Sequence, residues 1–416
     1  MKKYALWLCI FYTTNYPMSY TPSFTNPDLF LGEPRLTKNW LTTVDLILKG
    51  GHGLKGFNGC RQSVNALNIY GCENFHMLAK GVPDSVLNCN PDGFINNLWQ
   101  QDATLSNFGQ VCLAGKYSLL EFDLILAQNF LYGLFLSLYI PVQKEAIRGF
   151  TICDQTTKKS APTPALYYQW QSFINNIECN LQKYDVYIGN CKMSGLSDIQ
   201  LFGGWSFSHE NTTHIDFLDF TTALGVNIPT GKSCPLNAPF CLSLGYDGNL
   251  GIPFIAMISI GLWDWLTLGL DGAAMWFKDT TSEVAMKTAF EQSGCIRLAS
   301  DDANVKLGTM WSISPYLKLD HLIGGLSALF AFSYDHGNRS YITPCDPTYD
   351  INIVNCDQRL LSWDMTSFHF ILDFDLASFK HPWAPHLAFI IDKAIYGKRV
   401  FDSAIFGAEI TFDIEW

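Results

Sequence analysis

The sequence contains few charged residues and no long apolar run. Charged side chains make up 16 % of the 416 residues, against about 25 % in an ordinary soluble domain. A membrane-spanning helix needs about 20 consecutive apolar residues, and the longest clean apolar stretch, 252–263, is shorter and contains Pro, Ser and Gly. The sequence therefore excludes a polytopic helical membrane protein, although its mean hydropathy of +0.09 is high for a soluble chain.

Two further absences narrow the function. Lys and Arg number 27 against 38 Asp and Glu, and no basic stripe is present, so no nucleic-acid partner is expected, because phosphate binding needs clustered Lys and Arg. No Cys-x-x-Cys pair occurs, which argues against a zinc ribbon or a thioredoxin-type motif; we expect no metal and no cofactor. The 12 Trp, 18 Tyr and 30 Phe exclude disorder.

The N-terminus has the pattern of a secretory signal peptide. Lys2 and Lys3 precede an apolar run over 4–12, and small or polar residues follow. We assign 1–20 to the signal peptide; a short buried strand is the alternative. Residues 21–40 are Pro-rich and polar, and are expected either to lie in a lumen as a partial plug or to hang in the periplasm.

The rest of the chain, 41–416, alternates between apolar and polar residues with a period of two, the signature of β-strands. The predicted strands are 42–50, 117–127, 131–142, 197–208, 215–228, 252–263, 265–277, 309–320, 325–335, 366–377, 387–396 and 404–416. Most have the length that a tilted strand needs to cross a bilayer, about 9–11 residues. These features predict a 12-stranded antiparallel transmembrane β-barrel, an all-β fold.

The connections between these strands alternate between short and long. The long ones are 51–116, 143–196, 229–251, 278–308 and 336–365. Short periplasmic turns and long outer loops are typical of bacterial outer-membrane barrels. Tryptophan supports this arrangement, since Trp205, Trp263, Trp265, Trp383 and Trp416 would lie at the short-turn end and Trp276, Trp311 and Trp363 at the long-loop end, forming two interfacial girdles.

Twelve of the 13 cysteines fall in the long connections, the exception being Cys9 in the apolar leader. An even number outside the strands predicts disulfides in an oxidising compartment; a set of buried free thiols is the alternative. Cys234–Cys241 and Cys345–Cys356 are the natural local pairs. The remaining loops hold four, three and one, so at least one bridge should link two loops.

The second long connection carries a helix signal. Thr163 can cap, Pro164 suits the first position, and apolar residues recur at helical spacing up to Leu181. This helix is expected either to narrow the barrel mouth or to pack against neighbouring loops. Segment 281–292 carries a shorter helical pattern.

The polar faces of the strands would line the lumen. The predicted pore-lining residues are Asp45, Glu121, Asp123, Asp219, Asp271, Lys318, His369, Asp373, Asp375, Asp392, Glu409 and Asp413. A pore of one charge sign favours counter-ions, which predicts passage of cations or neutral polar solutes. The alternative is that these acids only hydrate a narrow lumen, or pair with plug and loop residues.

No catalytic motif emerges. None of the nine His is followed two residues later by Ser, the spacing that outer-membrane phospholipases use. Asp373 and Asp375 share one face, which suits a catalytic pair or ordinary lumen lining. The Gly-rich segment 50–53 precedes no helix and is not a phosphate loop. We therefore predict no enzymatic activity and no catalytic residue.

The chain resembles Gram-negative outer-membrane β-barrel proteins. The end of the sequence, Ala408–Trp416, looks like their assembly signal, with Ile410, Phe412, Ile414 and Trp416 at alternate positions. Residues 223–231 are similar to a strand-to-loop segment of transporter-like barrels, including the phenol-degradation meta-pathway family. The resemblance implies a bilayer with lipopolysaccharide and the barrel-assembly machinery as partners. The loop cysteines and the apolar composition depart from ordinary porins.

These observations predict an exported, porin-like channel of the bacterial outer membrane that passes small polar or cationic solutes. A surface structural or adhesive protein, in which the barrel is only an anchor, is the main alternative, because the loops hold about half of the chain. A soluble secreted all-β protein is the third.

Overall fold

The computed structural model describes residues 40–101, 107–210, 215–263, 265–323, 325–376 and 385–415. Twelve long strands form the wall: β1 (Leu41–Phe57), β4 (Gln110–Asn129), β5 (Leu134–Asp154), β7 (Ile199–Glu210), β8 (Phe217–Ile228), β9 (Gly251–Trp263), β10 (Leu266–Phe277), β13 (Met310–Ile323), β14 (Leu326–Gly337), β16 (Trp363–Asp375), β17 (His386–Lys398) and β18 (Val400–Glu415). Each pairs antiparallel with its neighbours in this order.

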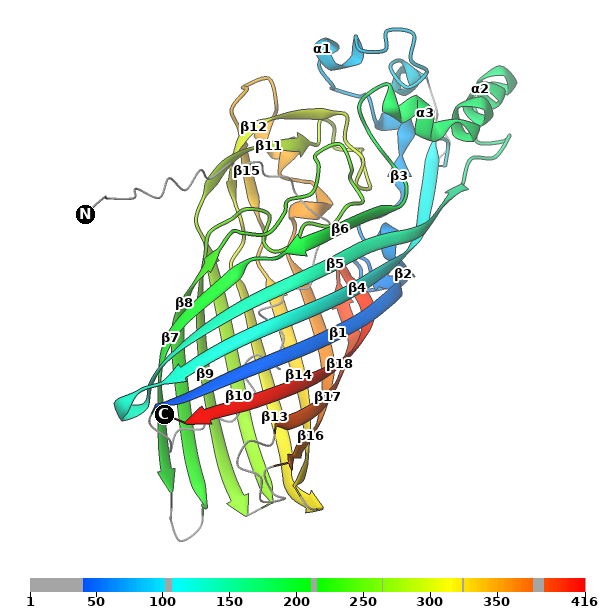
Figure 1. The fold of residues 1–416 in the computed structure, drawn as a ribbon. Helices are drawn as coiled ribbons and strands as arrows, with labels where there is room; N and C mark the ends of the chain where they lie inside the picture. The colour runs from blue at the N-terminus through cyan, green and yellow to red at the C-terminus, as the bar shows by residue number, and fades with distance from the viewer. Residues whose placement is uncertain are drawn as a thin grey trace, which may run out of the picture.

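The barrel closes between its first and last strands. β1 pairs with β18 from Leu41 opposite Glu415 onward, and with β4 on its other side. Because every strand edge is paired, the backbone polar groups are satisfied within the wall, as a spanning barrel requires. Figure 1 shows the tilted strands and, at one end of the barrel, the long connections gathered into a cap. The predicted 12-stranded antiparallel barrel is confirmed.

The outer face of the wall carries large apolar side chains. Leu48, Phe122, Phe254 and Phe412 are exposed on the outside, where the apolar face of a spanning barrel meets lipid. Each side chain that points into the barrel lies opposite another inward-pointing side chain on the neighbouring strand. This holds for all twelve strand pairs, so one continuous face lines the interior. Side-chain alternation in the sequence therefore specified which face is buried.

Three strands extend well beyond their predicted segments toward the cap, and the first of them, β1, continues past residue 50 to Phe57. β4 and β5 extend past the outer end of the predicted segments, and their register continues to Val111 opposite Asp154. Cys112 and Cys153 consequently lie in strands, whereas the sequence analysis placed them in connections. This hairpin supports the cap above the barrel, because β3 (Glu73–Asn74) pairs with β4 there and β6 (Cys191–Leu196) pairs with β5.

The long connections are numbered loops 1 to 5: 58–109, 155–198, 229–250, 278–309 and 338–362. Their remaining elements are β2 (Ser63–Asn65), η3 (Ala66–Asn68), η4 (Phe75–Met77), α1 (Asp84–Leu87), η5 (Leu98–Gln100), α2 (Pro164–Asn175), α3 (Ile177–Gln182), β11 (Thr280–Met286), β12 (Ala299–Lys306), β15 (Tyr341–Pro344), α4 (Ile351–Val354) and η7 (Gln358–Leu360); η6 (Leu131–Gly133) lies in the turn between β4 and β5. β11, β12 and β15 form a separate three-stranded sheet from loops 4 and 5.

The predicted helix of loop 2 is present and packs against loop 1. The Thr163 side chain accepts a hydrogen bond from the Leu166 N–H at 3.2 Å, and Pro164 opens the helix. Trp170 is fully buried, with Phe75 and Phe108 of loop 1 at ring-centroid distances of 6.2 and 5.8 Å. Of the two predicted roles of this helix, the structure therefore confirms packing against neighbouring loops and not narrowing of the barrel mouth.

The helical prediction for 281–292 is wrong. Residues Thr280–Met286 form strand β11, in which Ser282, Val284 and Met286 alternate as the buried positions. The period of two over these residues outweighs the weak helical pattern, because β12 offers a complete ladder from Thr280 opposite Val305 to Met286 opposite Ala299.

The disulfides differ from the predicted local pairs. The bridges are Cys72–Cys112 and Cys191–Cys241. The predicted Cys234–Cys241 pair is wrong, because loop 3 brings Cys241 to β6 while the Cys234 thiol donates to the Ala238 carbonyl in its own turn. Cys345 and Cys356 are free thiols as well. The expected bridge between loops is present, since Cys191–Cys241 ties loop 2 to loop 3.

The tryptophan girdles are present with one correction. Trp263 and Trp265 stack at the short-turn end with ring centroids 5.8 Å apart, and Trp276 is exposed at the other end. Trp363 is instead 8 % exposed, because it is on the inward face and packs against Met365 and Val400. Trp383 and Trp416 lie outside the described residues.

Some sequence predictions fall outside the described residues. These are the signal peptide over 1–20 and all of the segment 21–40 except its last residue. Among the described residues, no helix is long and apolar enough to cross a membrane.

Candidate functional site

The inner face of the barrel carries all twelve of the predicted pore-lining residues. Register fixes this placement: Lys49 of β1 lies opposite Glu121 of β4, and His369 of β16 lies opposite Asp392 of β17. The other strands continue the same face around the ring. Ten of the twelve residues are acids, beside Lys318 and His369.

A charged cluster occupies the inner wall at β1, β4 and β5. Lys49 Nζ lies 3.3 Å from Asp123 Oδ2 and 4.0 Å from Glu121 Oε1. The Tyr139 hydroxyl donates to Asp123 at 3.0 Å, and the Gln143 amide donates to Glu121 at 2.6 Å. All five side chains are at most 5 % exposed. Because an unpaired buried charge is costly, Lys49 holds these two acids in place.

A second cluster joins β14, β16 and β17. His369 Nδ1 lies 2.6 Å from Asp392 Oδ1, and His369 Nε2 lies 2.9 Å from Ser333 Oγ. This serine–imidazole–carboxylate order is that of a catalytic triad. However, the Ser333 hydroxyl donates its only hydrogen to Asp335 Oδ2 at 2.9 Å, so His369 Nε2 must be the donor to Ser333. The four side chains therefore form a hydrogen-bonded chain from Asp392 through His369 and Ser333 to Asp335, in which the serine is not activated as a nucleophile.

The remaining predicted residues lie at several levels of the barrel. Lys318 forms an ion pair with Asp320 at 2.9 Å, and His386 lies 3.5 Å from Asp375 near the short-turn end. The Thr43 hydroxyl donates to Asp413 at 3.0 Å. Five further predicted acids lie on the same inner face: Asp45, Asp219, Asp271, Asp373 and Glu409. Among the described residues, no group of His, Cys, Asp and Glu could hold a metal ion.

The inner face also carries apolar patches that the sequence analysis missed. Ile47, Ile125 and Ile390 pack together with Tyr139 on one side of the interior. Near the mouth, Phe202, Ile255 and Met275 form another patch. Their inward position follows from alternation, since Ile47 lies between the inward residues Asp45 and Lys49, and Ile125 follows Glu121 and Asp123 on the same face. The sequence prediction listed only polar side chains for the lumen and so left these apolar ones out.

Loop 3 packs against the inner wall near the mouth. Tyr246 packs on the patch of Phe202 and Ile255 and lies 5.2 Å from the Phe277 ring. Asp198 fixes the loop, because its carboxylate accepts hydrogen bonds from the Gly231 N–H at 2.9 Å and the Tyr246 N–H at 2.8 Å. The loop 2 helix, which was one predicted constriction, lies instead in the cap.

The cap has its own hydrophobic core, to which loops 1 to 4 contribute. Its buried members include Phe75, Trp170, Phe240 and Ile296, one from each of these loops in order, and Phe401 of the wall. The Tyr117 ring of β4 stacks on the Phe401 ring with centroids 4.8 Å apart, and this contact joins the core of the cap to the rim of the barrel.

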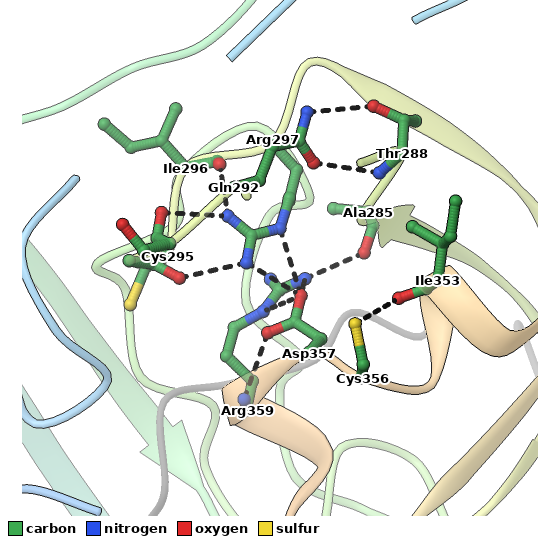
Figure 2. Close-up of polar contacts among 12 residues, drawn as sticks. Ala285, Thr288, Gln292, Cys295, Ile296, Arg297, Ile353, Cys356, Asp357 and Arg359 are labelled. Carbon is green, nitrogen blue, oxygen red and sulfur yellow. Dashed lines mark hydrogen bonds and ion pairs between the residues drawn. The ribbon is translucent and has the colours of Figure 1, made fainter. Parts of the chain in front are cut away.

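A buried ion cluster joins loop 4 to loop 5 (Figure 2). Asp357 Oδ2 accepts from Arg297 Nε at 3.0 Å and from Arg359 Nη2 at 2.8 Å. Burial alone would raise the pKa of Asp357, but the two guanidinium groups outweigh burial and hold this pKa below its ordinary value. Arg359 also donates to the Ala285 carbonyl at 2.9 Å, and Arg297 donates to the Ile296 carbonyl at 2.7 Å.

Glu73 of loop 1 completes this junction. Its carboxylate accepts the Cys295 N–H at 2.6 Å and the Ile296 N–H at 3.1 Å. Burial raises the pKa of Glu73 to about 7, although these N–H groups and Arg297 favour the charged form. Loops 1, 4 and 5 are thus held together by buried ionisable side chains. These residues lie far apart in the chain, so no sequence motif could predict their contacts.

Comparison with known proteins supports the fold. An outer membrane channel from Pseudomonas putida F1 superposes with a TM-score of 0.52 at 10 % sequence identity, covering 92 % of this chain and 98 % of the other. The toluene transporter TodX of Pseudomonas putida gives 0.34 at 8 % identity over 96 % of both chains, and the translocator domain of the autotransporter NalP from Neisseria meningitidis gives 0.34 at 9 % over 94 % of both. No protein-family model and no curated protein matches the sequence.

The chain has the fold of an outer-membrane β-barrel channel. The resemblance drawn from its C-terminal strand therefore holds at the level of the fold.

Proposed function

We propose that this protein is an outer-membrane channel through which small polar solutes pass, cations in preference to anions. The observation that carries the proposal is the acid-rich inner face, on which ten acids stand against Lys318 and His369 among the twelve predicted lining positions. Acids along one path lower the energy of a cation there and raise that of an anion.

The clusters differ in what they offer a solute. Glu121 and Asp123 are engaged by Lys49, Tyr139 and Gln143 and serve chiefly to hold the wall together. Asp375 is different, since its side chain is 37 % exposed and its ion pair with His386 is long at 3.5 Å. We infer that the acids toward the short-turn end select solutes, and that loop 3 with Tyr246 limits their size at the mouth.

Localisation follows from the same features. A barrel with an apolar outer face has to sit in a bilayer, and the similar structure from Pseudomonas putida is an outer membrane channel. We infer an outer-membrane location with export by the signal peptide and insertion by the barrel-assembly machinery, lipopolysaccharide being the outer lipid partner. Ile410, Phe412 and Ile414 lie on the strand that closes the barrel, where an assembly signal would act.

A solute-flux assay tests the channel. Protein in liposomes should let small cationic and neutral solutes enter faster than anionic solutes of matched size. The double variant Asp373→Asn, Asp375→Asn should reduce this preference, whereas Glu283→Gln, which removes a charge from an exposed position of strand β11 in the cap, should leave it unchanged. Folded protein that admits no solute of any charge would overturn the proposal.

The cap favours one alternative, a surface adhesive role. Its separate core and buried ion cluster give it more fixed structure than a pore entrance needs. In that case the protein would insert and fold but pass no solute, and binding to a host or envelope surface would depend on exposed cap residues such as Tyr168 and Phe290.

A further inference from the structure

Three cysteines lie in a row across the wall beneath the cap. Cys72 directly precedes β3, whose Glu73 lies opposite Val111, so Cys72 is level with Cys112 and bonded to it, with Cα atoms 4.5 Å apart. On the other side of β4, the register places Cys112 opposite Cys153 of β5. Cys112 therefore has a cysteine on each flank, and only one of the two can be its partner at a time.

The third cysteine can replace the first. Residues directly opposite in an antiparallel pair have Cα atoms about 4.5–5.5 Å apart, which falls within the roughly 4.4–6.8 Å that disulfides span. Cys153 is a free, exposed thiol. Cys112 and Cys153 also share a face of the sheet, since paired residues point to the same side.

We propose that Cys72, Cys112 and Cys153 form a thiol–disulfide exchange site. The Cys153 thiolate attacks Sγ of Cys112; the Cys112–Cys153 bond forms as the Cys72–Cys112 bond breaks, and Cys72 leaves as a thiolate that takes up a proton from water. One disulfide is broken and one is made, so the step needs no external oxidant or reductant.

Chain entropy leaves the two bridges nearly balanced. Cys72 and Cys112 are 40 residues apart in the sequence, and Cys112 and Cys153 are 41 apart. Loop-closure entropy depends on the logarithm of this length and so favours neither. The contacts that hold each cysteine decide the balance.

The exchange would remove the covalent tie between β4 and the part of the cap that follows Cys72, because this segment of loop 1 contacts loop 4. The Ser293 hydroxyl donates to the Cys72 carbonyl at 2.7 Å, Glu73 accepts two N–H groups of loop 4, and the Thr288 hydroxyl donates to the Lys80 carbonyl at 2.7 Å. From there the ion cluster of Figure 2 reaches loop 5. Cys72–Cys112 is the covalent tie between β4 and this whole set of contacts.

Disulfide mapping of the full-length, membrane-inserted protein tests the exchange. Thiols are blocked with an alkylating reagent, and the peptides of a non-reducing digest are identified by mass spectrometry. In a glutathione redox buffer, the wild type should yield both the Cys72–Cys112 and the Cys112–Cys153 linked peptides. Cys153→Ser should yield only the first, and Cys72→Ser only the second. Cys179→Ser, which removes another exposed free thiol of loop 2, should match the wild type.

Two results would overturn the proposal. One is that Cys72→Ser leaves Cys112 and Cys153 both alkylated as free thiols while its heat-modifiable gel mobility shows a folded barrel. The other is that the wild type, which carries no variant that could misfold, shows only Cys72–Cys112 after prolonged incubation in the redox buffer. The mapping requires no conductance, so its result is separate from that of the channel proposal.

Hydrogen exchange tests the release of the cap. Peptides covering 72–82 and 288–297 should exchange at least tenfold faster in Cys72→Ser than in Cys153→Ser. Equal exchange in the two variants would contradict the release of these segments, even if the second bridge forms.

Discussion

Replacing Asp357 with Asn should loosen the cap and leave the barrel intact. Asp357 is 1 % exposed and is the shared anion of Arg297 and Arg359, at 3.0 and 2.8 Å. Asn has nearly the same shape, and its carbonyl oxygen can still accept the Arg359 N–H that the carboxylate now accepts at 3.1 Å. The substitution thus removes the charge and leaves two buried guanidinium groups without their anion.

The expected cost follows from this geometry. Removing one partner of a buried ion pair costs about 3–5 kcal/mol, because the other charge remains buried. A cap held by this cluster should therefore open roughly 10² to 4 × 10³ times more often, at about 1.4 kcal/mol for each factor of ten. The wall should not respond, since its strands are held by their own ladder.

Hydrogen exchange of the protein in liposomes measures this effect. Peptides over 285–300 and 351–362 should lose protection in Asp357→Asn, while peptides from β9 and β10 should not change. Glu291→Gln is the matched control, because the Lys80–Glu291 pair has side chains 36 % and 49 % exposed, and exposed pairs contribute only about 0–1 kcal/mol. If Asp357→Asn behaved like Glu291→Gln, the ion cluster would not be what holds loops 4 and 5 together.

Three further predictions concern the cap and the wall. Burial raises the pKa of Glu73 from 4.5 to about 7, so between these two pH values the carboxyl stays protonated in the folded cap and is ionised in the unfolded segment. Protonated Glu73 therefore stabilises the folded cap by up to roughly 3 kcal/mol. This stabilisation is fully present below about pH 4.5 and is lost as the pH rises through 7. Protection of 288–297, corrected for the intrinsic exchange rate, should therefore fall between pH 5 and pH 8, and a flat profile would refute the burial of an ionisable Glu73. Gly294→Ala should open the same junction, because a Cβ at this position would overlap the Glu73 carboxyl and the backbone there has a φ of +76°; proteolysis within loop 4 should speed up, and an unchanged rate would contradict the contact. Lys49→Met should lower the temperature at which the folded gel band is lost, since it leaves Glu121 and Asp123 buried without their cation. Lys393→Met is the control and should have little effect, because the Lys393 side chain is 44 % exposed beside Asp402. Equal temperature shifts in the two variants would show that the inner cluster does not support the wall.

Much of the barrel could be predicted from the sequence because a spanning strand has to alternate. Phe412 and Asp413 differ in polarity because one faces lipid and the other the interior, and the same constraint recurs in every wall strand. Strand ends above the membrane lack this constraint, which is why the extension of β4 to Gln110 and of β5 to Asp154 was missed.

The candidate site could be predicted only in part. Alternation identified inward residues such as His369 and Asp392 but gave no register between strands, and register is what places Ser333 beside His369. The pairing of Cys241 with Cys191 and the contacts of Asp357 are likewise long-range properties of the cap. Proximity along the chain favoured Cys234 for Cys241 and was misleading for this reason.

Reversal potential in a planar bilayer tests the central claim most directly. Folded wild-type protein under a salt gradient should give discrete conductance steps and a reversal potential shifted toward that of the cation. The double variant Asp373→Asn, Asp375→Asn should move this potential toward zero, while Glu283→Gln should not. A folded, inserted barrel that conducts no ions, or one whose wild-type reversal potential shows anion preference, would contradict the account.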